Sequence, residues 1–420
     1  MRVFLSLAIA LAACASPSSE RQTRSAQVPL PQAEAAEVGM SATGLARIEP
    51  AMQRWVDEGR VAGIVTMVAR GGRLVHWESV GYRDLESRTP LQADDIFRIY
   101  SMTKPVTSVA VMMLVEEGKL ALIDPVSRYL PVFSNVRVYA DGAGVPPRRP
   151  ITIEDLLRHT SGLSYGPPIG RTAVDAMYAE AGVFSGDLTT LVERVAALPL
   201  VDHPGARWNY GVSTDVLGRL VEVVSGQPFD EFLAARIFRP LGMVDTGFVV
   251  PEAKADRVPA VYRSGRGGIQ VVDPPLDISL SARPALLSGG GGLVSTAADY
   301  VRFAQALLNG GELDGARLLR PETVTLMRTN GLDASLIPIG FGPNRLAGYG
   351  FGLGFSVLVD EDATPLPDND GVFRWLGIGS TYFWIDPEAE LIALVMTQFY
   401  PPLGALETEF QTLVYGAIRD

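Results

Sequence analysis

The chain has 420 residues, with 36 Lys and Arg against 47 Asp and Glu, which gives a formal net charge of −11. Hydrophobic residues make up 47% of it and charged residues 20%, so it can bury a large core and is not intrinsically disordered. The acidic balance argues against nucleic acid as a partner, because phosphate binding needs a clustered basic surface. The single cysteine, Cys14, excludes an intramolecular disulfide and a cysteine-based metal site, and no metal or other cofactor is expected.

The first residues have the pattern of a secretion signal. Met1-Arg2 is positive, and residues 3–13 form an apolar stretch that suits a signal peptide but is too short to span a bilayer. Leu11-Ala12-Ala13-Cys14 resembles a bacterial lipobox, which implies cleavage before Cys14 and attachment of a lipid to its thiol. Ala15 is compatible with sorting to the outer membrane. An ordinary signal peptide is the alternative.

We therefore expect three parts in the chain. Residues 1–13 are a lipoprotein signal peptide, and residues 14–38, which lack an apolar period, are a flexible tether. The folded part then lies on the periplasmic face of a bacterial membrane, as an outer-membrane lipoprotein held by its lipid.

The folded part is predicted to begin with a helix and a hairpin. Apolar residues at helical spacing over 44–59 predict a helix that ends at Gly59. Residues 63–70 and 74–80 are predicted strands, joined by the two-residue hairpin signal Gly71-Gly72. A strongly apolar helix follows over 101–117.

Helical patterns dominate the middle of the chain, and strands return at its end. The predicted helices are 153–159, 188–198, 214–225 and 229–238, with an irregular proline loop at 139–150. A glycine run at 289–292 marks a sharp passage of the backbone before a helix over 296–308. The last predicted elements are strands at 351–359, 372–376, 382–385 and 391–396 and a helix over 406–418.

This order predicts a mixed α/β (α+β) fold. An antiparallel sheet built from both termini is flanked by helices, and a mostly helical region is inserted into it. We expect an α/β domain over 39–120 and 281–420 and a helical domain over 121–280.

Ser101-Met102-Thr103-Lys104 opens the apolar helix, in a chain with 33 arginines and only three lysines. Residues three apart share a helix face, so the hydroxyl and the amine can meet. A lysine can activate a serine when burial lowers its pKa, whereas an arginine cannot lose its proton. Ser101 is therefore the candidate nucleophile, and Lys104 is its candidate base.

This S-x-x-K sequence resembles the motif of the acylated serine in the serine β-lactamase and penicillin-binding-protein superfamily. Leu156–Leu163 and Trp208–Gly218 resemble segments of its class C-like branch, and the resemblance covers residues 40–420. It implies a β-lactamase/transpeptidase-like fold. It also makes Tyr210 the proton-shuttling tyrosine of the branch's Y-x-N motif, with Val212 in place of the asparagine.

Trp375-Leu376-Gly377 is the best match to the third motif, usually K-T-G or H-T-G. The resemblance implies an oxyanion hole formed by the backbone N–H groups of Ser101 and Ile378. Arg374 cannot supply the missing cation, because adjacent strand residues face opposite sides. The W-x-G pattern resembles the family VIII carboxylesterases.

That resemblance implies a carboxylesterase that cleaves short-chain esters through an acyl-serine, with a small-molecule ester as its partner. Tyr100, Tyr165, Trp375 and Gly377 are expected to bind the substrate. A β-lactamase or D-Ala-D-Ala carboxypeptidase is the main alternative, followed by a transesterase or lactonase and by an inactive binding module with the same fold.

A second serine motif is less convincing. Gly162–Gly166 matches G-x-S-x-G, but a helical pattern precedes it and His203 is the only later histidine. Ser164 is therefore predicted to be a turn residue near the cleft. His76, His159 and His203 lack metal-ligand spacing.

Overall fold

The computed structural model describes residues 28–419 except 141, 274–281, 342–343 and 368. The predicted signal peptide, Cys14 and the tether up to residue 27 lie outside the described residues. No helix in the described part of the chain is both long and apolar enough to cross a bilayer. The end of the predicted tether is packed: Leu30 and Ala35 are buried, and the Ala33 N–H donates to the Leu74 carbonyl at 3.1 Å. The folded part therefore begins well before residue 39.

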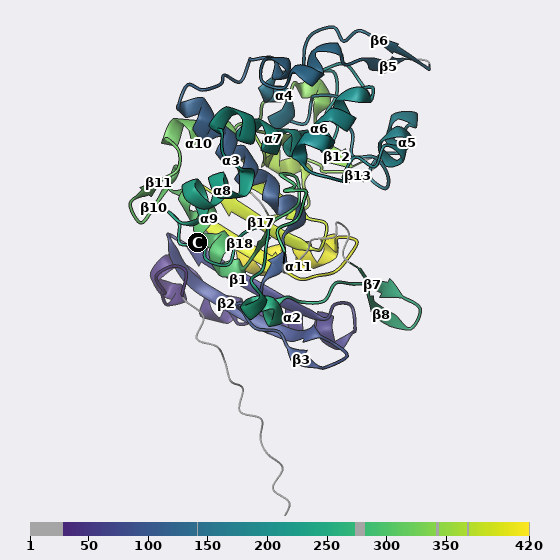
Figure 1. The fold of residues 1–420 in the computed structure, drawn as a ribbon. Coiled ribbons are helices and arrows are strands. Elements are labelled where there is room, and N and C mark those ends of the chain that lie inside the picture. The colour runs from purple at the N-terminus through teal and green to yellow at the C-terminus, as the bar shows by residue number, and fades with distance from the viewer. Residues whose placement is uncertain (1–27, 141, 274–281, 342–343, 368, 420) are drawn as a thin grey trace, which may run out of the picture.

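Both ends of the chain contribute to one eight-stranded antiparallel sheet, as predicted (Figure 1). The strand order is β14–β15–β16–β17–β18–β1–β2–β3. The strands are β1 (Gly63–Arg70), β2 (Arg73–Asp84), β3 (Thr89–Pro90), β14 (Tyr349–Phe351), β15 (Ser356–Leu358), β16 (Phe373–Gly377), β17 (Thr381–Asp386) and β18 (Leu391–Met396). The two ends of the chain meet where β1 pairs with β18, with Val65 opposite Met396.

Helices cover both faces of this sheet. Phe383 and Trp384 are neighbours in β17 and therefore point to opposite faces. Phe383 contacts Tyr300 of α9 (Ala297–Leu308), whereas Trp384 contacts Phe410 of α11 (Gly404–Tyr415). Because both faces are covered, β17 and β18 are buried along their whole length.

Six further helices form a group beside the sheet (Figure 1). They are α3 (Thr103–Glu116), α4 (Ile153–Leu157), α5 (Ala173–Glu180), α6 (Leu188–Ala197), α7 (Ser213–Ser225) and α8 (Phe229–Leu233). Helix α7 packs against α3, α4, α6 and α8. Residues Thr103–Leu114 of α3 are all buried, which explains why its apolar residues are not confined to one face.

Three predicted elements differ in the structure. The helix predicted over 44–59 is two helices, α1 (Ala42–Leu45) and α2 (Ile48–Asp57), and α8 continues into a π-helical turn, Ala234–Phe238. The strand predicted over 351–359 is instead the β14–β15 hairpin. Gly354, at φ 100°, reverses the chain between these strands in a conformation that a side chain would disfavour.

Several elements were not predicted. Helices α5 and α10 (Pro321–Met327) and strand β3 are among them, as are the paired strands β4 (Phe97–Arg98) with β9 (Val294–Ser295), β5 (Val138–Ala140) with β6 (Ala143–Val145), β7 (Tyr262–Gly265) with β8 (Gly268–Val271), β10 (Glu312–Leu313) with β11 (Ala316–Arg317), and β12 (Gly340–Phe341) with β13 (Asn344–Arg345). The β4–β9 pair ties the segment before Ser101 to the segment after the glycine run.

Candidate active site

Ser101 lies in a tight 3-10 turn, Tyr100–Met102, that leads directly into α3. The Tyr300 hydroxyl from α9 holds this turn by donating to the Met102 carbonyl at 2.9 Å. Tyr100 has φ 43°, a left-handed conformation that is costly for a non-glycine residue and that clusters at functional sites. The serine thus precedes the N-terminus of α3, where the helix carries partial positive charge.

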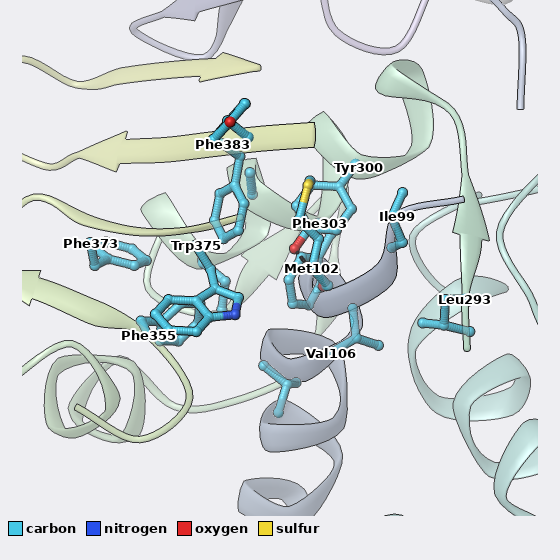
Figure 2. Close-up of a cluster of buried hydrophobic side chains, with 14 of the residues drawn as sticks. Ile99, Met102, Val106, Leu293, Tyr300, Phe303, Phe355, Phe373, Trp375 and Phe383 are labelled. Atoms are coloured by element: carbon cyan, nitrogen blue, oxygen red, sulfur yellow. Dashed lines mark hydrogen bonds between the residues drawn. The ribbon is translucent and has the colours of Figure 1, made fainter. Parts of the chain in front are cut away.

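Apolar side chains pack around the start of α3 (Figure 2). Met102 and Val106 belong to the same buried cluster as Trp375 of β16 and Phe383 of β17. This packing holds the turn that carries Ser101 in a constant position relative to the sheet.

The structure brings the predicted pair together: Lys104 Nζ donates to Ser101 Oγ at 3.2 Å. The same nitrogen donates to the Gly290 carbonyl at 2.6 Å and to the Tyr165 hydroxyl at 3.2 Å. Together the three oxygens accept all three N–H bonds of a protonated lysine. A neutral amine has only two N–H bonds, and one of them must point to the Gly290 carbonyl, which can only accept. When the other points to the Tyr165 hydroxyl, the nitrogen lone pair faces Ser101 Oγ.

Burial makes the neutral form of Lys104 accessible. The side chain is 1% exposed, and desolvation lowers its pKa to about 7, against the opposing influence of the Asp215 carboxylate. At neutral pH a substantial fraction of the amine is therefore unprotonated. The sequence-based expectation that burial lowers the pKa of this lysine agrees with its environment.

Tyr210 reaches the same oxygen from the loop before α7, and its hydroxyl donates to Ser101 Oγ at 2.7 Å. Its ring contacts those of His159, at 4.9 Å between centroids, and Trp375, at 5.6 Å. Burial raises the pKa of the Tyr210 phenol well above its ordinary value. Tyr210 is therefore a protonated donor in the resting site and not a phenolate.

The loop that carries Tyr210 is supported by residues that follow α4. The Asn209 amide donates to the Leu163 carbonyl at 2.7 Å, and the Val212 N–H donates to the Ser164 carbonyl at 3.1 Å. Val212 is fully buried, so the position of the motif's missing asparagine is part of the core. The third position of the motif is therefore an apolar core side chain in this protein.

The end of β16 lies beside the nucleophile, as the third-motif match predicts. A Cβ on Gly377 would lie 2.4 Å from the Ile99 carbonyl oxygen, so only glycine allows the strand to approach the turn before Ser101 this closely. Ile378 follows directly and is half-buried. The role of its N–H as an oxyanion donor stays a prediction.

Arg374 and Trp375 face opposite sides of the sheet, as strand geometry predicts. Trp375 contacts Tyr210, whereas Arg374 forms a buried ion pair with Glu407 of α11 and donates to the Tyr349 hydroxyl at 3.2 Å. Arg374 is thus engaged on the far face and cannot place its charge at Ser101.

Two residues predicted to bind substrate have other surroundings. Tyr165 lies half-buried in the site, where its hydroxyl accepts from Lys104 and its ring stacks on Tyr210, and its role in binding substrate stays a prediction. Tyr100 is 1% exposed, and a Cβ on Gly379 would lie 2.6 Å from its ring, so the side chain is packed in the core. A side chain this deeply buried offers almost no surface to a substrate.

The G-x-S-x-G serine is a turn residue, as expected. Ser164 is buried, donates to the Asp175 carboxylate and accepts from the Gly166 N–H at 3.3 Å. Its hydroxyl is committed to holding the turn.

Residues that the sequence analysis did not assign to the site also surround it. Asp215 of α7 is fully buried near Lys104, and Gly290 supplies the lysine's shortest hydrogen bond. Phe341 contacts the rings of Tyr210 and Trp375. The glycine run was visible as a sharp passage of the backbone, but no sequence pattern linked it to Lys104.

An antiparallel sheet with an inserted helical region, carrying a serine within reach of a lysine and a tyrosine, defines a serine hydrolase or acyltransferase with the β-lactamase fold. The chain belongs to the beta-lactamase family, whose model matches residues 45–415.

Known relatives place it in the esterase-like branch of the serine β-lactamase and penicillin-binding-protein superfamily. It is 34% identical over 376 residues to esterase EstB of Burkholderia gladioli, covering 84% of this chain and 90% of EstB. It is 41% identical over 360 residues to protein Rv1367c of Mycobacterium tuberculosis H37Rv, covering 83% of this chain and 88% of Rv1367c. Among solved structures, EstCE1, "a hydrolase with promiscuous acyltransferase activity", superposes with a TM-score of 0.77 at 29% identity, covering 89% of this chain and 99% of EstCE1.

Proposed function

We propose that the protein is a carboxylesterase that hydrolyses short-chain esters through an acyl-serine. The observation that carries this proposal is the convergence of Lys104 Nζ and the Tyr210 hydroxyl on Ser101 Oγ, at 3.2 and 2.7 Å. A nucleophile within reach of a base and a proton donor is the arrangement that acyl transfer requires.

In the first step Ser101 Oγ bonds to the ester carbonyl carbon, and its proton passes to the neutral Lys104 amine. The N–H groups of Ser101 and Ile378 hold the oxyanion. The carbon–oxygen bond to the alcohol then breaks, and the alcohol leaves with a proton from Tyr210, which Lys104 replaces. Water attacks the acyl-serine by the reverse proton path and releases the acid and free Ser101.

Aromatic side chains support a small, neutral acyl group as the substrate. The rings of Trp208, Phe341 and Trp375 surround Tyr210, with centroids 6.1, 5.1 and 5.6 Å from it. Such walls favour apolar groups. Trp375 stands where penicillin-recognising relatives carry a cation, which argues against the alternative of a β-lactamase or D-Ala-D-Ala carboxypeptidase.

A substrate panel separates these functions. Hydrolysis of p-nitrophenyl acetate, butyrate and octanoate, nitrocefin and a D-Ala-D-Ala peptide is measured with the wild type, Ser101→Ala and Lys104→Arg. We expect the butyrate or acetate ester to be preferred, and both variants to lose about 10³-fold or more in kcat/KM. Lys119→Arg is the matched control for Lys104→Arg, because Lys119 is a surface lysine paired with Glu117.

Other outcomes would change the assignment. Faster turnover of nitrocefin or the peptide than of every ester would identify the alternative function. Equal background rates for wild type and Ser101→Ala on all substrates would identify an inactive binding module. Transfer of the acyl group to added alcohols in preference to water would identify a transesterase.

The same proposal places the enzyme on the periplasmic face of the outer membrane, held by a lipid on Cys14. Labelling with radioactive palmitate and partition into detergent, compared between wild type and Cys14→Ala, tests the anchor. Equal labelling of the two would contradict it.

A further inference from the structure

The glycine run that supplies the Gly290 carbonyl is held from the α3 side by three side chains. Thr107 donates to the Gly289 carbonyl at 2.7 Å, Lys104 donates to the Gly290 carbonyl at 2.6 Å, and the Leu293 N–H donates to the Thr103 hydroxyl at 3.1 Å. One helix thus fixes both ends of the run, and Lys104 bonds to its centre.

Asp215 of α7 holds the same run from the opposite side. Its Oδ1 accepts from the Ser288 hydroxyl at 2.5 Å and from the Gly290 N–H at 3.0 Å. A Cβ on Gly290 would lie 2.5 Å from Asp215 Oδ2 and 3.1 Å from the Tyr165 hydroxyl. Glycine is therefore required for the carboxylate to reach this close to the lysine's binding site.

The second oxygen of Asp215 is buried without a hydrogen-bond partner among the described residues. The residue is 0% exposed. Burial raises the pKa of Asp215, and the charge of Lys104 and the two hydrogen bonds to Oδ1 oppose this by favouring the ionised form. An isolated buried carboxylate is costly unless a cation compensates it, and Lys104 is the cation whose charge it influences.

The other titratable groups that face Lys104 are neutral and cannot balance a positive charge on it. Burial raises the pKa values of Tyr165 and Tyr210, so both stay protonated and neutral. Burial and the nearby lysine lower the pKa of His159 well below its usual value, so it is neutral as well. Asp215 is the one acidic group among these neighbours.

We infer that Asp215 is a positioning residue for Lys104: it holds the Ser288–Gly292 run in place and stabilises the ammonium that forms when Lys104 takes the Ser101 proton. The inference rests on the proposed function, in which Lys104 is the base. An ammonium in a site this dry would otherwise be unfavourable, so the carboxylate stabilises the charge that develops during the reaction.

The test uses a fluorophosphonate that labels the active serine, so its result does not depend on which ester is preferred. The rate of labelling at Ser101 is measured from pH 5 to 9 for wild type, Asp215→Asn and Asp215→Glu. Removing the negative charge lowers the pKa of Lys104, so we expect the acidic limb of the Asp215→Asn profile to move about 1 unit to lower pH, with a plateau about tenfold lower. Asp215→Glu keeps the charge and its limb stays at the wild-type position.

An Asp215→Asn limb at the wild-type pH would overturn the inference and leave the proposed function intact. Failure of wild type to label at Ser101 would instead remove the proposed function and the inference with it. Stability gives a second reading that does not need activity. At pH 5.5 Asp215→Asn leaves a buried ammonium uncompensated, so adding Lys104→Met should raise the melting temperature; no rise would contradict the inference.

Discussion

Lys104 and Tyr210 both reach the Ser101 hydroxyl, but they reach it in different protonation states. Burial disfavours the charged form of each group, so it lowers the pKa of the lysine to about 7 and raises that of the tyrosine. The neutral amine can therefore accept a proton, and the protonated phenol can donate one, which are the roles that the proposed mechanism gives them. Asp215 bonds to the glycine run that contacts Lys104, and the rings of Trp208, Phe341 and Trp375 surround Tyr210.

The first prediction concerns the pH dependence of activity. The folded-state pKa of Lys104 lies below that of a free lysine, and the base form is the one that has lost its proton. The kcat/KM for p-nitrophenyl butyrate should therefore rise as pH increases through about 7 and level off above it. Initial rates from pH 5 to 9 measure this, and a profile that is flat between pH 6 and 8 would contradict it.

The two tyrosines beside Lys104 should not be equivalent. Tyr210→Phe removes the donor to Ser101 Oγ, and we expect kcat to fall about 10² to 10⁴-fold. Tyr165→Phe removes only an acceptor for Lys104, and its effect should be about tenfold or less. Both variants keep the ring, so thermal unfolding checks that each is folded. Equal losses would show that Tyr210 has no special part in proton transfer.

Phe341 should limit the length of the acyl chain. Its half-buried ring contacts Tyr210 and Trp375, so Phe341→Ala opens apolar space beside the nucleophile. We expect the ratio of kcat/KM for p-nitrophenyl octanoate to that for the butyrate to rise about tenfold, the scale of discrimination for a few methylene groups. Phe341→Leu keeps much of the volume and should change the ratio less. An unchanged ratio in Phe341→Ala would place the acyl chain elsewhere.

The ion pair on the far side of β16 should matter for stability and not for chemistry. Arg374→Met leaves Glu407 buried without its cation, which should lower the free energy of unfolding by about 3–5 kcal/mol. Adding Glu407→Leu should restore most of that loss, because the unpaired charge is then gone. Denaturant unfolding of the two variants measures this. A double variant as unstable as Arg374→Met alone would show that packing, and not the charge pair, is decisive.

Much of the fold was predictable because its signals are local. The β1–β2 hairpin is marked by Gly71-Gly72 between two apolar runs, and β18 lies at its predicted bounds, 391–396. The error at 351–359 arose because an alternating pattern does not by itself distinguish one strand from a hairpin. The turn there depends on Gly354, whose backbone conformation is visible only in the structure.

The sequence by itself determined that Ser101 and Lys104 meet, because one helical turn connects them. It also determined that the side chains of Arg374 and Trp375 face opposite sides of the sheet, because successive side chains of a strand alternate. Only the tertiary structure decided that Tyr210, Asp215 and Gly290, each more than a hundred residues further along the chain, enclose that lysine. Contacts between distant segments depend on how whole helices and loops pack, and it is this packing that removes water from Lys104 and lets it act as a base.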